Sequence, residues 1–201
     1  MSIFKVLDLI RWDLRINRGA SWDSIRAKLL LIEIRLEQFC YGRLRQNPNV
    51  IKHIIWLLIR GFGSVFQWFL CSSNIPGTIT IGRGLRLPHP QNIILAGFAD
   101  IGEFCTIYHN VSIAWNGFKP VIHGSPNIGN CVLIGASAVI VGDVCIGSDV
   151  LIGAGTVVST SVPDHSRVTG GKAQIVERYN SEEAAVPGSE RHLQDPYAIW
   201  R

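Results

Sequence analysis

Aliphatic side chains recur every six residues from Ile75 onward, and this period constrains the possible folds more than any other feature of the chain. Neither the 3.6-residue period of a helix nor the two-residue alternation of a strand would hold aliphatic residues in such a frame for so long. Hexapeptide repeats are typical of a parallel β-helix, in which each repeat buries its aliphatic residue only by stacking on its neighbours. We therefore expect a mostly β fold, a left-handed parallel β-helix. The thirteen framed positions are Ile75, Ile81, Leu87, Ile93, Ile101, Ile107, Ile113, Ile128, Ile134, Ile140, Ile146, Ile152 and Val158.

The six-residue frame breaks at two places. Two extra residues fall between Ile93 and Ile101, and nine fall between Ile113 and Ile128. The longer insertion predicts a loop that is extruded from the β-helix.

The first 74 residues have a different pattern and form an α-helical N-terminal region. We expect an amphipathic helix over residues 3–16, a turn over 17–21 and a second helix from there to about Gln46. Residues 50–70 approach transmembrane length, but charged residues lie within the stretch and Gly61 and Gly63 interrupt it, which favours a buried or interfacial helix pair. The expected organisation is a helical region at 1–74, a β-helix domain at 75–176 and a polar tail at 177–201.

The distribution of charge and the cysteine content indicate which surfaces and which cellular compartment suit the protein. Residues 1–74 hold 11 Lys/Arg against 5 Asp/Glu, whereas residues 75–201 hold 8 against 10. Any attraction to an anionic surface, such as the inner face of the cytoplasmic membrane, therefore belongs to the N-terminal region. Five cysteines without CxxC spacing argue against a disulfide framework, and the N-terminus lacks a signal-peptide pattern, so we expect a cytoplasmic protein. No motif for nucleic-acid binding is present.

With three hexapeptides per coil, candidate functional residues would stack in a column along one edge of the β-helix. Residues eighteen apart then stack at the inter-strand spacing of about 4.8 Å, and each insertion shifts the count by its own length. Counting from His89 gives His109, Ala136 and Ala154, each two places after a core aliphatic residue. Two imidazoles followed by two small side chains would leave a groove for a long, thin ligand such as the pantetheine arm of coenzyme A. Histidine is the expected general base for acyl transfer, because its pKa lies near 6.5.

Residues 75–176 resemble the serine acetyltransferase group of hexapeptide transferases, including the colanic acid and capsular polysaccharide O-acetyltransferase branch. The resemblance is carried by IGRGLRLPHPQNIIL, ADIGEFCTIYHNVSIA and the run from SPNIGNCVLIG to GGKAQIV. It implies a homotrimer or a dimer of trimers, with active sites between adjacent prisms and acetyl-CoA as the donor. His89 falls on the catalytic histidine of the family, with Ala136 and Ala154 on its coenzyme A groove. His109 is a second catalytic candidate, and Lys172 is a further candidate for binding the cofactor.

The sequence departs from serine acetyltransferases at residues that bear on the acceptor. The resemblance places Asn74 and Pro88 where the family has an aspartate that orients the catalytic histidine and one that helps to hold serine. Asn74 stays a catalytic candidate. The second family histidine aligns with Ser125, although His123 could replace it, so both are candidates for binding the substrate. We therefore expect the acceptor to be a sugar hydroxyl in surface polysaccharide biosynthesis, free or lipid-linked, with serine as the alternative.

The expected mechanism is direct transfer, with a backbone N–H near Ala114 or Trp115 stabilising the oxyanion. Cys105 and Cys131 lie beside core positions and are expected to be buried rather than nucleophilic. A zinc lyase that uses His89, His109 and His123 is disfavoured because it lacks closely spaced ligands, so no metal is expected. A trimeric scaffold without catalytic activity is the non-enzyme alternative.

Overall fold

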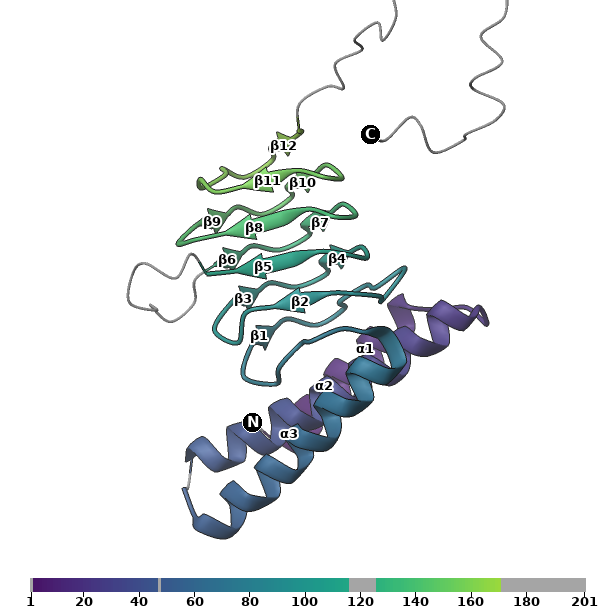
Figure 1. The fold of residues 1–201 in the computed structure, drawn as a ribbon, viewed down its shortest axis with the longest axis vertical. Helices are drawn as coiled ribbons and strands as arrows, with labels where there is room; N and C mark the ends of the chain where they lie inside the picture. Colours follow the sequence, from purple (N-terminus) through teal and green to yellow (C-terminus); the bar gives the residue numbers. More distant parts are fainter. Residues whose placement is uncertain (1, 47, 116–125, 171–201) are drawn as a thin grey trace, which may run out of the picture. The chain divides into compact units, whose positions relative to one another are not determined.

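A computed structural model of the chain describes residues 2–46, 48–115 and 126–170, which hold three helices and twelve short strands (Figure 1). The helices are α1 (Ile3–Ile16), α2 (Trp22–Gln46) and α3 (Val50–Cys71). The strands are β1 (Thr80–Ile81), β2 (Ile94–Leu95), β3 (Asp100–Ile101), β4 (Thr106–Ile107), β5 (Ser112–Ala114), β6 (Asn127–Ile128), β7 (Leu133–Ile134), β8 (Val139–Val141), β9 (Cys145–Ile146), β10 (Leu151–Ile152), β11 (Val157–Val158) and β12 (Arg167–Val168). His123, Ser125 and Lys172 lie outside the described residues.

The strands form three parallel sheets that wind as a left-handed β-helix, which confirms the predicted fold. We name the sheets by their strand order: sheet A is β2-β5-β8-β11, sheet B is β1-β3-β6-β9 and sheet C is β4-β7-β10-β12. The chain visits sheets B, C and A in turn (Figure 1), and the coils from β3 to β11 contribute one strand to every sheet. In the first and last coils an isolated bridge takes the place of one strand, Arg86 with Thr106 and Val162 with Ile146. In every strand of sheets A and B, and in β4, β7 and β10 of sheet C, the second residue is buried, and these residues belong to the core. The six-residue frame in the sequence therefore reports one core residue for each side of the prism.

The corners of the prism require a left-handed backbone conformation, which residues other than glycine rarely adopt. At the corner between sheets B and C, successive coils place Gly84, Phe104, Cys131, Asp149 and His165 at φ values from 56° to 73°. The backbone N–H of each non-glycine residue in this column donates to a carbonyl of the preceding coil at 2.8–2.9 Å. Inter-coil hydrogen bonds thus offset the cost of a left-handed conformation, which is of order 1–3 kcal/mol for a non-glycine residue.

The shorter insertion lies elsewhere than the sequence pattern predicts. Leu95, not Ile93, aligns with Ile113 on sheet A, and Ile101 follows Leu95 by the regular six residues. The two extra residues therefore lie between Leu87 and Leu95, in the corner that contains His89. The prediction was wrong because Ile93 and Leu95 are both aliphatic and both buried, so the frame fits either of them.

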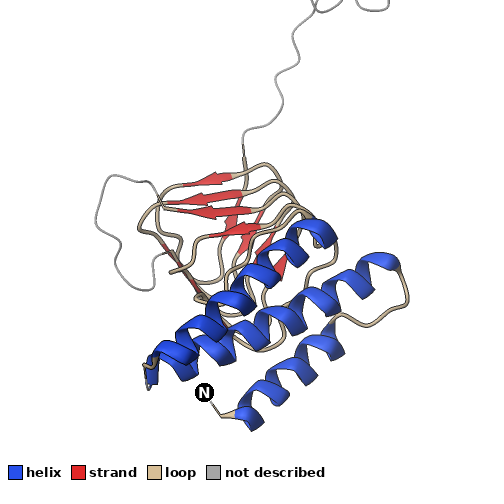
Figure 2. Cartoon of the chain, turned by 60° about the horizontal axis from the view of Figure 1, so that its bottom comes forward, coloured by secondary structure: helices blue, strands red, loops and turns tan. Residues whose placement is uncertain are grey.

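The three helices cover the end of the prism that begins with β1, as seen from that end in Figure 2. The predicted bounds of α1 and α2 are confirmed, but residues 50–71 form one continuous helix rather than a pair. Gly63 faces the carboxylate of Glu33 on α2 and lies within the continuous helix.

A buried ionic network attaches the helices to the first coil. Arg35 on α2 donates to Asp13 on α1 at 2.8 Å and to the carbonyls of Ile81 and Gly82 at 2.7 and 2.6 Å. Asp13 in turn accepts from the backbone N–H groups of Gly84 and Leu85 at 2.9 and 3.1 Å. Every charged oxygen of Asp13 is thereby occupied in a site closed to water, which fixes both helices on the β-helix.

Helix α3 turns Gln67 inward and leaves most of its large apolar side chains exposed. Its buried residues are Gly63, Gln67 and Cys71, and Gln67 donates to Glu33 of α2 at 2.7 Å. Phe69 is 86% exposed and Phe62 72%. By length and composition α3 could cross a membrane, and only 17% of its most apolar window is buried. The expectation of a buried helix is therefore wrong, while that of an interfacial helix is compatible with this surface.

Candidate functional site

The four residues of the predicted column lie at the corner between sheets C and A, which we name the histidine corner (residues 88–92, 108–110, 135–137 and 153–155). The inter-coil hydrogen bonds place Gln91 rather than His89 in register with His109, because the carbonyl of Gln91 accepts from Asn110 at 3.0 Å. His89 therefore lies at the same corner, but within its two-residue lengthening. His89 and His109 are neighbours, with ring centroids 5.7 Å apart and planes nearly perpendicular. The carbonyl of His109 accepts from Ser137 at 3.0 Å, and that of Ala136 accepts from Gly155 at 2.8 Å. The pairing of Ile107 with Ile134 and of Ile134 with Ile152 sets this register, because each column member follows its core residue by two positions.

The small residues of the column leave few side-chain atoms projecting from the outer surface of the corner. Ala136 follows Gly135, whose Cβ, if present, would lie 2.6 Å from the backbone N of Ala154 on the next coil. Glycine is therefore required for the coils to approach, and alanine limits what projects beside it. On the coils that carry Ala136 and Ala154, the column presents backbone and methyl groups, and it continues to the two imidazoles on the preceding coils.

His89 is held by an aspartate from the N-terminal helices. Its Nδ1 lies 2.8 Å from Oδ2 of Asp23, and the side-chain amide of Gln91 donates to the other oxygen, Oδ1, at 2.6 Å. The hydrogen bond from His89, with the donation from Gln91, lowers the pKa of Asp23 below its usual value. An ionised carboxylate accepts only, so the proton between the two groups belongs to Nδ1.

In the neutral imidazole with its proton on Nδ1, Nε2 carries the free lone pair and is the nitrogen that can act as a base. Among the described residues it makes no hydrogen bond, and the side chain is 52% exposed. The neighbouring rings are those of His109 and Tyr108, the latter at 6.4 Å. Nδ1 of His109 is buried without a hydrogen-bond partner among the described residues.

The side chain of Asn74 contacts helix α3 among the described residues. Its Oδ1 accepts from Arg60 on α3 at 3.2 Å, and its backbone pairs with Ile94 on sheet A. The acid that contacts His89 comes instead from α2, more than sixty residues earlier in the chain than His89.

Ala114 and Trp115 lie away from the histidine corner of their own chain. Ala114 ends β5, pairs with Val141 on sheet A and leads toward the next corner, where Trp115 contacts Phe98 edge-on at 6.4 Å. Any contribution of these residues to a site at His89 would have to come from a second copy of the chain.

The two cysteines on the rungs have different environments. Cys105 is fully buried, and burial raises the pKa of its thiol to about 11, so it cannot act as a thiolate at neutral pH. Cys131 is exposed at a prism corner, so the expectation that it is buried is wrong.

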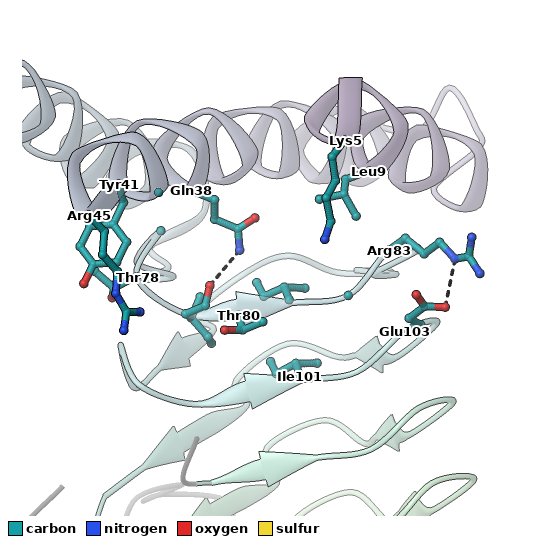
Figure 3. Close-up of a pocket in the computed structure, with 15 residues that line it drawn as sticks. Lys5, Leu9, Gln38, Tyr41, Arg45, Thr78, Thr80, Arg83, Ile101 and Glu103 are labelled. Carbon is teal, nitrogen blue, oxygen red and sulfur yellow. Dashed lines mark hydrogen bonds and ion pairs between the residues drawn. The ribbon is translucent and has the colours of Figure 1, made fainter. Parts of the chain in front are cut away.

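A pocket among the described residues is separate from the histidines. It has a volume of about 420 Å³, lies between α1, α2 and β1, and is lined by Lys5, Gln38 and Thr80 among other residues (Figure 3). Its wall includes the ion pair between Arg83 and Glu103 at 3.0 Å. It contains no histidine, so we place the candidate site at the histidine corner. The described residues contain no cluster of three or more histidine, cysteine or acidic side chains suited to a metal ion.

Fold and site together define a left-handed β-helix of hexapeptide repeats with a histidine and carboxylate pair at one corner. Residues 125–160 match the family model described as bacterial transferase hexapeptide (six repeats). A serine acetyltransferase of Helicobacter pylori is 37% identical over 88 residues, which are 43% of this chain and 50% of the relative. A probable serine acetyltransferase of Oryza sativa is 38% identical over 103 residues, 48% of this chain and 33% of the relative. The chain thus spans half or less of the curated relatives that it matches.

Solved structures of serine acetyltransferases share the fold. Isoform 3 of Entamoeba histolytica, solved with cysteine, superposes with a TM-score of 0.69 at 18% identity. The superposition covers 90% of this chain and 64% of the Entamoeba chain. The enzyme of Neisseria gonorrhoeae gives 0.67 at 23% identity, covering 91% and 71%. A serine acetyltransferase in complex with CoA gives 0.65 at 20% identity, covering 87% and 70%.

The sequence reasoning missed Asp23 and Gln91. Gln91 lies two positions after His89 in the lengthened corner, and this proximity was a usable signal. Asp23 carried none, because nothing in a one-dimensional pattern indicates that the first turn of a helix reaches a β-helix corner.

Proposed function

We propose that this protein is an acyltransferase that transfers an acetyl group from acetyl-CoA to a hydroxyl group. The observation that carries the proposal is the histidine corner, where an oriented imidazole adjoins a strip of small residues along successive coils. The similarity to serine acetyltransferases, one of them solved with CoA, supports the same reaction class.

In the proposed mechanism His89 acts as the general base. Nε2 accepts the proton of the acceptor hydroxyl while its oxygen attacks the thioester carbonyl, and the proton then passes to the departing sulfur of coenzyme A. A new ester bond forms, the C–S bond breaks and no acyl-enzyme is needed. The pantetheine arm would follow Ala136 and Ala154, whose methyl groups leave room along the coils. Oxyanion stabilisation by a backbone N–H near Ala114 or Trp115 would require a neighbouring protomer.

Free serine is the acceptor that the relatives support best, so the alternative named from the sequence becomes the main proposal. The curated relatives described above are serine acetyltransferases. Serine is also small enough to reach His89 in an open corner. We therefore place serine first among acceptors.

A sugar hydroxyl is the second candidate, favoured by helix α3 and by two departures from the serine acetyltransferase pattern. Asn74 and Pro88 replace aspartates of the family, and Asn74 bonds to Arg60 instead of to the site. The exposed apolar face of α3 would suit contact with the cytoplasmic membrane, where lipid-linked saccharides are found. The polysaccharide branch of the family combines such an acceptor with the same donor.

An acceptor screen with labelled acetyl-CoA tests both candidates. Serine, nucleotide-activated sugars and lipid-linked sugars are compared, and His89→Ala is expected to lower kcat by about 10²-fold or more, as is typical for loss of a general base. His165→Ala is the matched control, because His165 also bonds to an aspartate, Asp149 at 2.9 Å, at a different corner. Wild-type turnover by His89→Ala would contradict the assignment. Absence of coenzyme A binding at millimolar ligand would favour the inactive scaffold.

A further inference from the structure

We infer that Asp23, on the first turn of helix α2, is the positioning residue that fixes the tautomer and orientation of His89, in place of an acid from the β-helix itself. The inference rests on the proposed function, because an oriented base has a purpose only in a transfer reaction. It makes the N-terminal helices part of the active site rather than an attachment to it.

The contacts around Asp23 are those of an orienting group. Each carboxylate oxygen has its own partner: Oδ2 contacts Nδ1 of His89 at 2.8 Å, and Oδ1 accepts from Gln91 at 2.6 Å. Arg26, one turn further along α2, lies 3.8 Å from Oδ1. With both oxygens engaged, the carboxylate cannot rotate without breaking a hydrogen bond, so the imidazole plane is held as well.

The backbone of α2 keeps Asp23 in place. Ser21 caps the helix by accepting from the backbone N–H of Ser24 at 3.2 Å, and Ser24 in turn donates to the carbonyl of Asn17 at 2.7 Å. The positive end of the helix dipole also favours an ionised carboxylate at the first turn. Asn17 bonds to Leu85 and Leu87, just before the histidine corner, so the start of α2 and the corner share one rigid connection.

The lengthened corner explains why an acid from a helix can reach His89. The two extra residues lengthen this corner before Gln91, whose carbonyl keeps the regular inter-coil hydrogen bond by accepting from Asn110 at 3.0 Å. Gln91 itself binds the same carboxylate as His89. Asn74 carries no negative charge, so it cannot supply an orienting carboxylate.

The test compares Asp23→Asn with Asp149→Asn in the full-length protein. Asp149→Asn removes an equivalent histidine–carboxylate bond, that to His165 at 2.9 Å, outside the site. Nitrogen-15 NMR of the histidine side chains, with His89→Gln to assign the signal, is expected to show the Nδ1–H tautomer of His89 in wild type and its loss in Asp23→Asn only. In the same variant kcat is expected to fall about 10²-fold or more with KM for acetyl-CoA unchanged, as for loss of the orienting acid in other histidine-dependent enzymes.

The outcomes separate this inference from the proposed function. An unchanged tautomer in Asp23→Asn overturns the positioning role whatever the activity. A changed tautomer with unchanged kcat overturns it also, and a rise in acceptor KM alone would make Asp23 a substrate-binding residue instead. If wild type transfers acetyl to none of the acceptors, the proposed function fails, whereas the tautomer measurement still tests the contact.

Discussion

At the scale of single residues, the buried pair of Arg35 and Asp13 determines whether the helices stay on the β-helix. Both side chains are closed to water, with exposures of 0% and 1%, and burial raises the pKa of Asp13 while Arg35 opposes the rise. Removing one partner leaves a buried charge without compensation, which costs about 3–5 kcal/mol in comparable pairs. Arg35→Ala is therefore expected to lower the free energy of unfolding by that amount in urea denaturation.

The matched control for this prediction is the surface pair of Arg83 and Glu103. Their side chains lie 3.0 Å apart but are 41% and 44% exposed, so water replaces the lost partner. Arg83→Ala is expected to cost less than about 1 kcal/mol. Equal losses in the two variants would show that the buried network contributes nothing beyond an ordinary surface pair.

At the scale of elements, the contact between α2 and α3 contains an acid that resists ionisation. Burial raises the pKa of Glu33 to about 7, although Gln67 donates to it, and Glu37 on the same helix adds to the rise. A raised folded-state pKa means that the folded protein binds more protons than the unfolded chain between about pH 4.5 and pH 7. Stability is then greatest below this window and falls as the pH rises through it.

Thermal unfolding at pH 5 and pH 8 measures this effect. Wild type is expected to lose a few degrees of Tm at the higher pH, since about 1 kcal/mol corresponds to about 2–4 °C in a chain of this size. Glu33→Gln keeps the hydrogen-bonding shape without the charge and is expected to flatten the decrease. A variant with the same pH dependence as wild type would place the titrating group elsewhere.

At the scale of the whole molecule, the outer face of sheet A is suited to contact with further copies of the chain. Ile94, Ser112, Val139 and Val157 lie in register along this face, and Val157 is 67% exposed. Apolar residues in a row on an exposed sheet mark an interface. We predict that Val157→Glu dissociates the proposed trimer, as measured by light scattering after size exclusion.

A glutamate on sheet B is the appropriate comparison. Thr80 is exposed on the outer face of β1, where its register partners Asp100 and Asn127 are polar. Thr80→Glu is expected to leave the mass of the assembly unchanged. If both variants keep the wild-type mass, sheet A is not the interface.

The coils were predictable from the sequence because the β-helix is close to a one-dimensional object. Each repeat contacts mainly its neighbours, so a fixed count of residues brings His89, His109, Ala136 and Ala154 to one corner. The position of the short insertion was not predictable, since Ile93 and Leu95 satisfy the same pattern. The continuity of α3 was missed because a glycine costs a helix only about 1 kcal/mol, so Gly61 and Gly63 do not have to end it.

The sequence by itself determined the period, the sheets and the edge on which the histidines lie, because all three follow from local repetition. Only the tertiary structure decided what holds His89, because the acid belongs to a helix whose place depends on long-range contacts. Asp13, Asn17 and Arg35 connect segments about fifty to seventy residues apart, and they bring Asp23 to the corner. Such contacts depend on how an amphipathic helix packs on the end of a prism, and no spacing along the chain encodes that packing.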